Sequence, residues 1–279
     1  MAEGDVITAI NGRATLSVPN PSLLLRNQAG RQTLLTLTTA AGTNRQVIVE
    51  PIAASRDAEL RYDEWEYTRR LETERLGNGR IGYVHLRAMG TENMAEWARH
   101  FYPVYDRAGL VIDVRNNRGG NIDSWILNRL LRKAWFYWQG RAGQTTWNMH
   151  YAFRGHVVVL CNERTASDGE AFSEGFKRLG LGKVIGTRTW GGEVWLSAQR
   201  WLVDNGMASA AEFGVYGPEG AWLIEGHGVD PDITVDNLPR ATFNGGDAQL
   251  EAAIRHLQDL ITKDPRPVPP VPSRPIKTP

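Results

Sequence analysis

One serine lies where an apolar strand pattern gives way to a helical one. Ser167 follows the apolar run 157–160 and precedes a helical pattern over 169–179. A hydroxyl at such a turn is exposed, and the free N–H groups and dipole of a helix N-terminus favour developing negative charge. Ser167 is therefore a candidate nucleophile. With Glu170 it also fits the S-x-x-E capping box, which needs no catalysis, so a purely structural role stays open at this point.

A second turn of the same kind carries paired glycines. Residues 113–121 read DVRNNRGGN, after the apolar run 110–114 and before another helical pattern. Gly119 and Gly120 let the backbone expose N–H groups and let a ligand approach closely. Such donors suit an oxyanion hole or a phosphate cradle. A tight turn without any ligand is the alternative.

Histidine and cysteine give no sign of a metal site. No zinc-binding spacing occurs, so we expect neither a metal nor another cofactor. The single Cys161 excludes an internal disulfide framework and fits a small buried core residue. His227 lies close to Glu225 but between two glycines, as a turn residue would. The histidines are His85, His100, His150, His156, His227 and His256.

The elements that must position these residues alternate between strand and helix. Strands are predicted at 81–86, 110–114, 156–160 and 183–186, and helices at 53–76, 93–102, 122–137, 169–179 and 247–262. Near-continuous apolar runs are typical of strands that are buried on both faces. The alternation predicts an α/β layer structure with parallel pairing. Residues 1–52 instead read as a small β-rich unit, with strands near 5–12, 34–38 and 46–49 and a short helix at 21–27.

Composition is ordinary for a globular protein. The 279 residues are 42% hydrophobic and 23% charged, with a formal net charge of +1. That balance does not indicate nucleic acid or an anionic membrane surface as a partner. No apolar run is long enough for a transmembrane helix, and the first residues do not form a signal peptide pattern.

Three ordered motifs resemble a known family. The stretches RAGLVIDVRNNRGG, NERTASDGEAFSEGFKRLGLGKVIGTRTWGGE and IEGHGVDPDITV are similar to the catalytic domain of the S41, or tail-specific, serine peptidases, and in particular to their tricorn branch. The resemblance implies an α/β, crotonase-like (ClpP-like) fold over about residues 80–240. EGDVITAINGR and NPSLLLRNQAG resemble the second half of a PDZ domain, so we expect the chain to begin within one.

The resemblance assigns a role to each candidate. Ser167 attacks the scissile carbonyl, and the backbone N–H groups of Asp168 and Gly120 form the oxyanion hole. Glu225 is the acidic member that orients the base; an ordinary surface carboxylate is the alternative. The Ser–Lys dyad of the other large S41 branch is excluded, because Gly192 stands at the lysine position and the guanidinium of Arg188 stays protonated. The tricorn branch takes its histidine from an upstream segment, and no histidine here matches it.

These observations predict the domain boundaries and the partners of the protein. We expect a partial PDZ-like domain at 1–52, the peptidase domain at 53–263 and a Pro-rich tail at 264–279. Peptides are the implied substrates, a homo-oligomer the implied assembly, and the cytoplasm the implied location. Two alternatives remain: a catalytically incomplete peptide-binding or scaffold fragment, and a crotonase-fold enzyme acting on acyl thioesters. For the PDZ-like unit we expect a packed fragment without peptide binding, because the backbone donors for a peptide carboxylate are absent; a peptide-recognition domain is the alternative.

Overall fold

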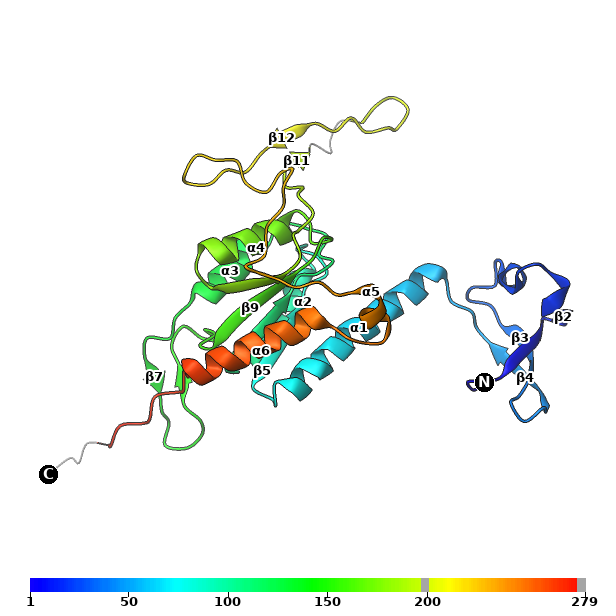
Figure 1. Ribbon diagram of the computed structural model, residues 1–279, viewed down its shortest axis with the longest axis horizontal. Helices are drawn as coiled ribbons and strands as arrows, with labels where there is room; N and C mark the ends of the chain where they lie inside the picture. Colours follow the sequence, from blue (N-terminus) through cyan, green and yellow to red (C-terminus); the bar gives the residue numbers. More distant parts are fainter. Residues whose placement is uncertain (197–200, 275–279) are drawn as a thin grey trace. The chain divides into compact units, whose positions relative to one another are not determined.

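The computed structural model describes residues 1–196 and 201–274. The chain divides into two compact units, Met1–Tyr67 and Thr68–Pro279, with the division inside helix α1 (Ala54–Leu76). Figure 1 shows each unit with its own sheet. None of the helices in the described ranges combines the length and the apolar character that crossing a bilayer requires.

The N-terminal unit is a four-stranded antiparallel sheet. Its strands β1 (Val6–Ile10), β2 (Arg13–Ala14), β3 (Thr33–Thr38) and β4 (Asn44–Val49) lie in the order β2-β1-β3-β4. The predicted short helix is a 3₁₀ helix at Pro21–Leu25, and the Asn20 side chain caps it by accepting from the Ser22 amide.

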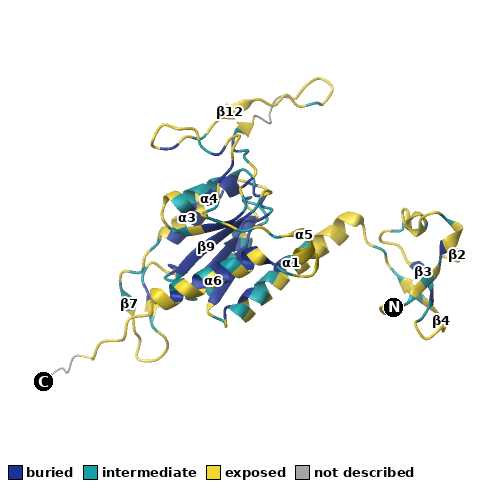
Figure 2. Cartoon of the chain, in the orientation of Figure 1, coloured by how far each residue is buried: buried dark blue, intermediate teal, exposed yellow. Residues whose placement is uncertain are grey.

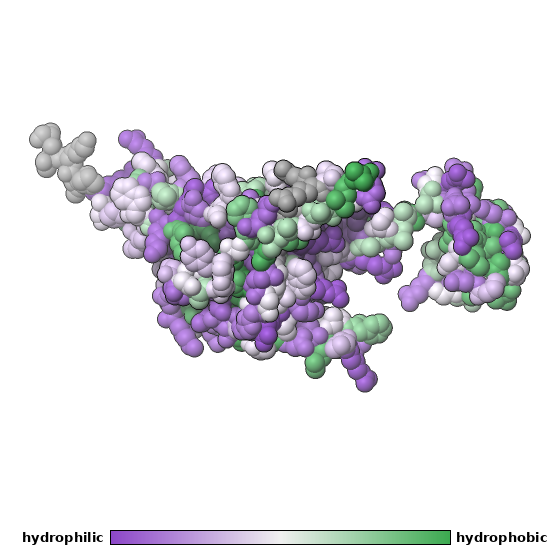
Figure 3. Space-filling view, turned by 90° about the horizontal axis from the view of Figure 1, so that it is seen from above, coloured by the Kyte–Doolittle hydropathy of each residue, from purple (hydrophilic) through white to green (hydrophobic). Residues whose placement is uncertain are grey.

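The core of this unit is small, and apolar side chains remain at its surface. The buried residues are Ile10, Leu35 and Leu37. Figure 3 shows hydrophobic residues exposed on this unit. A groove of about 620 Å³ lies beside β1, with Val6, Ile7, Ile10, Leu16 and Leu25 among its lining residues. The expectation that this unit binds no peptide stays a prediction.

A five-stranded parallel sheet forms the centre of the second unit. Its strands are β5 (Ile81–His85), β6 (Gly109–Asp113), β9 (His156–Cys161), β10 (Gly182–Gly186) and β13 (Ile233–Thr234), in the order β13-β10-β9-β6-β5. Every pair is parallel, as the alternation predicts. The strands β5, β6 and β9 are buried throughout, which accounts for their largely apolar sequence (Figure 2).

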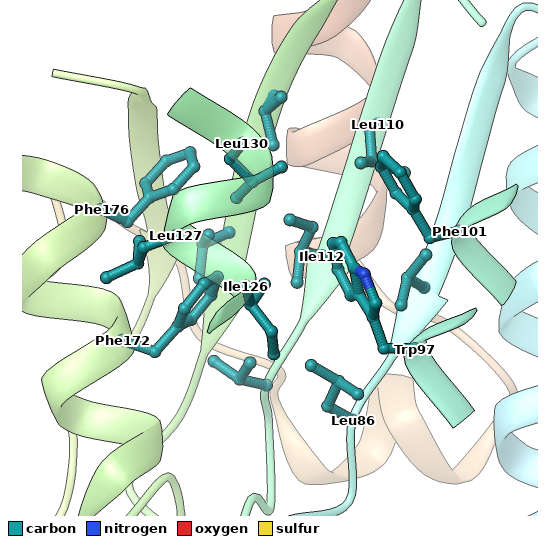
Figure 4. Packing of buried hydrophobic residues seen from close by; sticks show 14 of the residues in the cluster. Leu86, Trp97, Phe101, Leu110, Ile112, Ile126, Leu127, Leu130, Phe172 and Phe176 are labelled. Carbon is teal, nitrogen blue, oxygen red and sulfur yellow. The ribbon is translucent and has the colours of Figure 1, made fainter. Parts of the chain in front are cut away.

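Helices cover both faces of this sheet. α2 (Asn93–Phe101), α3 (Asp123–Leu131) and α4 (Asp168–Arg178) pack on one face through a cluster that Figure 4 shows from close by. α6 (Ala248–Lys263) packs on the other face. Because all strands are parallel, the segments that follow β6, β9 and β10 gather at one edge of the sheet, and these segments contain the candidate residues.

A buried charged network ties the end of β6 to the start of α6. The Asp113 carboxylate accepts from Arg115 Nη2 at 2.6 Å and from the Tyr83 hydroxyl at 2.9 Å, and Arg115 Nη1 donates to Asp247 Oδ1 at 2.8 Å. Asp247 also caps α6 by accepting from the Leu250 amide at 3.0 Å. The network anchors the chain just before the glycine-rich turn.

The predicted helix over 122–137 is too long. α3 ends at Leu131, and Arg132 is extended with φ −66° and ψ 135°. The aromatic residues that follow favour a strand. They form β7 (Tyr137–Trp138), which pairs with β8 (Thr146–Trp147) in a small hairpin.

The sequence patterns did not predict three further elements. β11 (Trp195–Leu196) and β12 (Ala211–Phe213) pair antiparallel in a projection whose residues are mostly exposed (Figure 2). α5 (Pro239–Phe243) is a single short helix before α6. These elements are too short for hydrophobic periodicity to reveal them.

Candidate active site

Ser167 occupies a strained position at the start of α4. Its φ is 53° and its ψ is −128°, outside the regions that side chains ordinarily adopt. Strain of this kind persists where surrounding structure enforces it, and it is common at functional sites. The capping box with Glu170 is also present, and the Ser167 amide donates to Glu170 Oε2 at 3.0 Å. Capping and a nucleophilic role are therefore compatible, since the cap holds the turn that presents the hydroxyl.

The glycine-rich turn lies directly against Ser167. A Cβ built on Gly119 would lie 2.5 Å from the Ser167 Cβ and 3.0 Å from its Oγ, so only a glycine fits there. Gly119 has φ 80° and Gly120 has φ 155°. The buried Asn117 joins the two turns, because its carbonyl accepts from the Ala166 amide at 2.9 Å and its Oδ1 accepts from the Gly119 amide at 2.8 Å.

Two backbone amides beside the serine are uncommitted. Within the part of the chain that the structure describes, the N–H groups of Gly120 and Asp168 donate to no protein acceptor. Asp168 directly follows Ser167 in the chain, and Gly120 directly follows Gly119, which lies against that serine. Preorganised amides of this kind are what an oxyanion hole requires.

The Asp168 side chain links the two helices behind this turn. Its Oδ2 accepts from the amides of Ile122 and Asp123 at 2.8 and 3.0 Å, at the N-terminus of α3. Burial, and then the charge of Asp123, raise the pKa of Asp168 to about 6. The side chain thus has a structural task that leaves its backbone N–H available.

Glu170 connects the serine to the segment after β10. Besides the Ser167 amide, its carboxylate accepts from Thr189 Oγ1 at 2.5 Å and from the amides of Gly191 and Gly192 at 2.7 and 2.9 Å. The residue is fully buried. The sequence indicated only its capping role; that it also holds the Gly191–Gly192 turn depends on a contact 21 residues away.

Glu225 is linked to Glu170 through the segment 191–194. Its Oε2 accepts from the amides of Glu193 and Val194, both at 2.8 Å, and the Gly226 amide donates to the Gly191 carbonyl at 2.9 Å. Segment 191–194 therefore joins Glu225 to Glu170, and through it to Ser167. Glu225 itself is exposed, so its remaining oxygen is accessible to another group.

Three of the histidines have partners other than Ser167. His85 Nδ1 lies 2.8 Å from the Asp113 carbonyl, and His156 Nε2 lies 2.8 Å from the Asp264 carbonyl. His227 Nε2 lies 2.9 Å from Asp230 Oδ2 at the surface. No histidine side chain hydrogen-bonds to Ser167 among the described residues.

Comparison with known proteins places this geometry in a family. The sequence model of Peptidase family S41 matches residues 80–235, and that of the Tricorn protease PDZ domain matches residues 1–54. The chain belongs to Peptidase family S41. The predicted S41 fold with its parallel α/β core is confirmed, and the N-terminal sheet is the predicted small PDZ-like unit.

The relatives of this S41 chain include longer tricorn proteins. "Tricorn protease homolog 1" of Streptomyces coelicolor is 34% identical over 268 residues, which are 96% of this chain and 25% of that protein. "Tricorn protease" of Thermoplasma acidophilum is 33% identical over 251 residues, covering 90% and 23%. A crystal structure of the tricorn protease matches 93% of this chain and 25% of its own, with a TM-score of 0.80 and 31% identity. The chain thus spans about a quarter of the length of these relatives.

Proposed function

We propose that this chain carries the catalytic part of a serine peptidase that hydrolyses peptide bonds, with Ser167 as the nucleophile. The observation that carries the proposal is the strained serine at the N-terminus of α4, with the uncommitted amides of Gly120 and Asp168 beside it. Its membership of family S41 supports the same reaction.

In the proposed mechanism, the Ser167 Oγ adds to the scissile carbonyl carbon as its proton passes to a base. The negative charge then moves to the carbonyl oxygen, where the amides of Gly120 and Asp168 donate to it. Each such donor is typically worth about 3–4 kcal/mol in the transition state. Return of the proton to the leaving amine gives an acyl-enzyme, and water releases the second product.

We propose that the base reaches the site from outside the described residues. Each of His85, His156 and His227 is bonded elsewhere, and Glu225 presents an exposed carboxylate that would orient an incoming imidazole. A serine without a base is a poor nucleophile, so hydrolysis by this chain alone is expected to be slow. The same feature favours the alternative function, a peptide-binding part of a longer protease.

Chemical rescue separates these possibilities. Peptide hydrolysis, followed by mass spectrometry with and without added imidazole, should rise with imidazole in the parent and stay at background in Ser167→Ala. Ser124→Ala, at an exposed position of α3, is the matched control and should behave like the parent. Rapid hydrolysis at a rate that does not depend on imidazole would contradict the proposal of an external base. Hydrolysis that survives in Ser167→Ala would contradict the proposed nucleophile.

We further propose that the protein acts on peptides as a homo-oligomer and in the cytoplasm. Exposed aromatic residues on the β11–β12 projection and around β7, such as Trp201, Trp222 and Trp138, offer surface for self-association. Light scattering coupled to size-exclusion chromatography tests the assembly, and a monomer at all concentrations would contradict it.

A further inference from the structure

Five carboxyl groups lie on the segments that are linked to the proposed nucleophile, and one differs from the others. Four of them accept hydrogen bonds: Glu170 from four donors, Asp168 from two amides, Glu225 from two amides and Asp123 from the Ser124 hydroxyl. Glu193 is 4% exposed, and its buried Oε2 has no hydrogen-bond partner among the residues that the structure describes.

The chain places Glu193 between two residues of the site. Its own amide donates to Glu225, and the preceding residue, Gly192, donates its amide to Glu170. The side chain is therefore held in a segment that is bonded at both ends, and it has little freedom to turn out to solvent.

We infer that Glu193 works as a neutral acid that sets the alkaline limit of the reaction at Ser167. In its protonated form it adds no charge to a site that must accept a new negative charge on the carbonyl oxygen. Once ionised, it opposes that charge. The inference rests on the proposed function, because it concerns the reaction at that same serine.

Electrostatics supports the neutral form near neutral pH. Burial raises the pKa of Glu193 to about 8, with further contributions from the charges of Asp168, Glu170, Asp123 and Glu225. These carboxyls belong to α4, to α3 and to the segment after Ile224. A buried carboxyl without a donor is most stable when it keeps its proton.

The expected effect is a change in reactivity rather than in structure. A unit charge near a developing oxyanion in a partly buried site changes the rate by about tenfold. Glu193→Gln mimics the neutral acid at every pH. The ratio of its rate to the parent's should therefore be close to unity near about pH 6.5 and rise to about ten near pH 9.5.

The first measurement follows the phosphonylation of Ser167 by a fluorophosphonate across this pH range, with imidazole present. Glu251→Gln, on the exposed side of α6 with an i,i+4 partner in Arg255, is the control and should keep a flat ratio. A flat ratio for Glu193→Gln as well would overturn the inference. A rising ratio in both variants would overturn it too, because the effect would then not belong to Glu193.

The second measurement does not need the reaction. An infrared difference titration should show a protonated carboxyl band that disappears near about pH 8 and is missing in Glu193→Gln. Absence of that band overturns the inference while leaving the proposed function intact. If the band is present but Ser167 is not labelled at any pH, the proposed function is overturned. The inference that Glu193 affects the reaction is then overturned as well.

Discussion

Replacing Glu170 with glutamine tests how the serine turn is held. The carboxylate is shared evenly: Oε1 accepts from Thr189 Oγ1 and the Gly191 amide, and Oε2 accepts from the amides of Ser167 and Gly192. A glutamine keeps the shape but supplies one oxygen and one NH₂ group. Whichever way it lies, its NH₂ group faces two donors.

The least costly orientation puts the NH₂ group at the Oε1 position. The Thr189 hydroxyl can then accept from it, although it already accepts from the Val229 amide at 2.7 Å. The Gly191 amide is left unpaired in a partly buried place, which costs about 1–3 kcal/mol. The remaining bonds lose their charge assistance, which adds about 1 kcal/mol. We therefore expect the free energy of unfolding of Glu170→Gln to fall by about 2–4 kcal/mol.

Urea unfolding followed by tryptophan fluorescence measures this loss, since the chain has 10 Trp. Glu174→Gln on the same helix is the control: Glu174 pairs with Arg178 near the surface, and its loss should cost about 0–1 kcal/mol. Labelling of Ser167 should slow in Glu170→Gln, because the turn loosens. Unfolding free energies that agree for the two variants would refute the proposed role of Glu170.

Three further predictions concern the surroundings of the serine. Gly119→Ala should lower the free energy of unfolding by about 1–3 kcal/mol and slow labelling of Ser167 more than about tenfold. The reason is that residue 119 has a φ of 80° and that the added Cβ would meet Ser167. Gly143→Ala is the control for backbone strain alone, because Gly143 has a φ of 93° and open space around it. Glu225→Gln should reduce imidazole-rescued hydrolysis by about tenfold or more while changing the free energy of unfolding by less than about 1 kcal/mol; equal hydrolysis would remove Glu225 from the mechanism. The free energy of unfolding of Glu193→Gln should rise relative to that of the parent by about 1–2 kcal/mol between about pH 5 and about pH 8, after allowance for solvent screening, and the difference should then level off. The raised pKa of Glu193 stabilises the folded parent below the unfolded value of 4.5. The parent loses that stability as pH rises through about 8, whereas the glutamine variant has no such group to ionise. A difference that shrinks with pH would contradict the raised pKa.

Sequence patterns located the main features of the site because each has a local cause. Ser167 and the glycine pair follow apolar runs that only a buried strand explains, and parallel strands bring their ends to one edge of the sheet. The Ser167–Glu170 spacing also predicted the capping box that the structure contains. The roles of Ser167, Gly120, Asp168 and Glu225 in catalysis remain proposals.

Long-range contacts explain what the sequence did not reveal. The other three donors to Glu170 come from residues 189–192, so only the folded chain shows that this carboxylate also holds a second turn. Glu193 stands out by the burial and the unpaired oxygen that its surroundings impose, and its sequence neighbours give no sign of either. The end of α3 at Leu131 depends on the β7–β8 pairing, which competes with the helical pattern.

The measurement that tests the central claim most directly is the site of covalent modification by a fluorophosphonate. Intact mass and peptide mapping of the 279-residue chain should find one adduct, on the peptide that contains Ser167, with formation that is slow alone and faster with imidazole. Ser167→Ala should gain no adduct, while Ser124→Ala should react like the parent. An adduct elsewhere, equal labelling of Ser167→Ala, or an unmodified Ser167 even with imidazole would contradict the account.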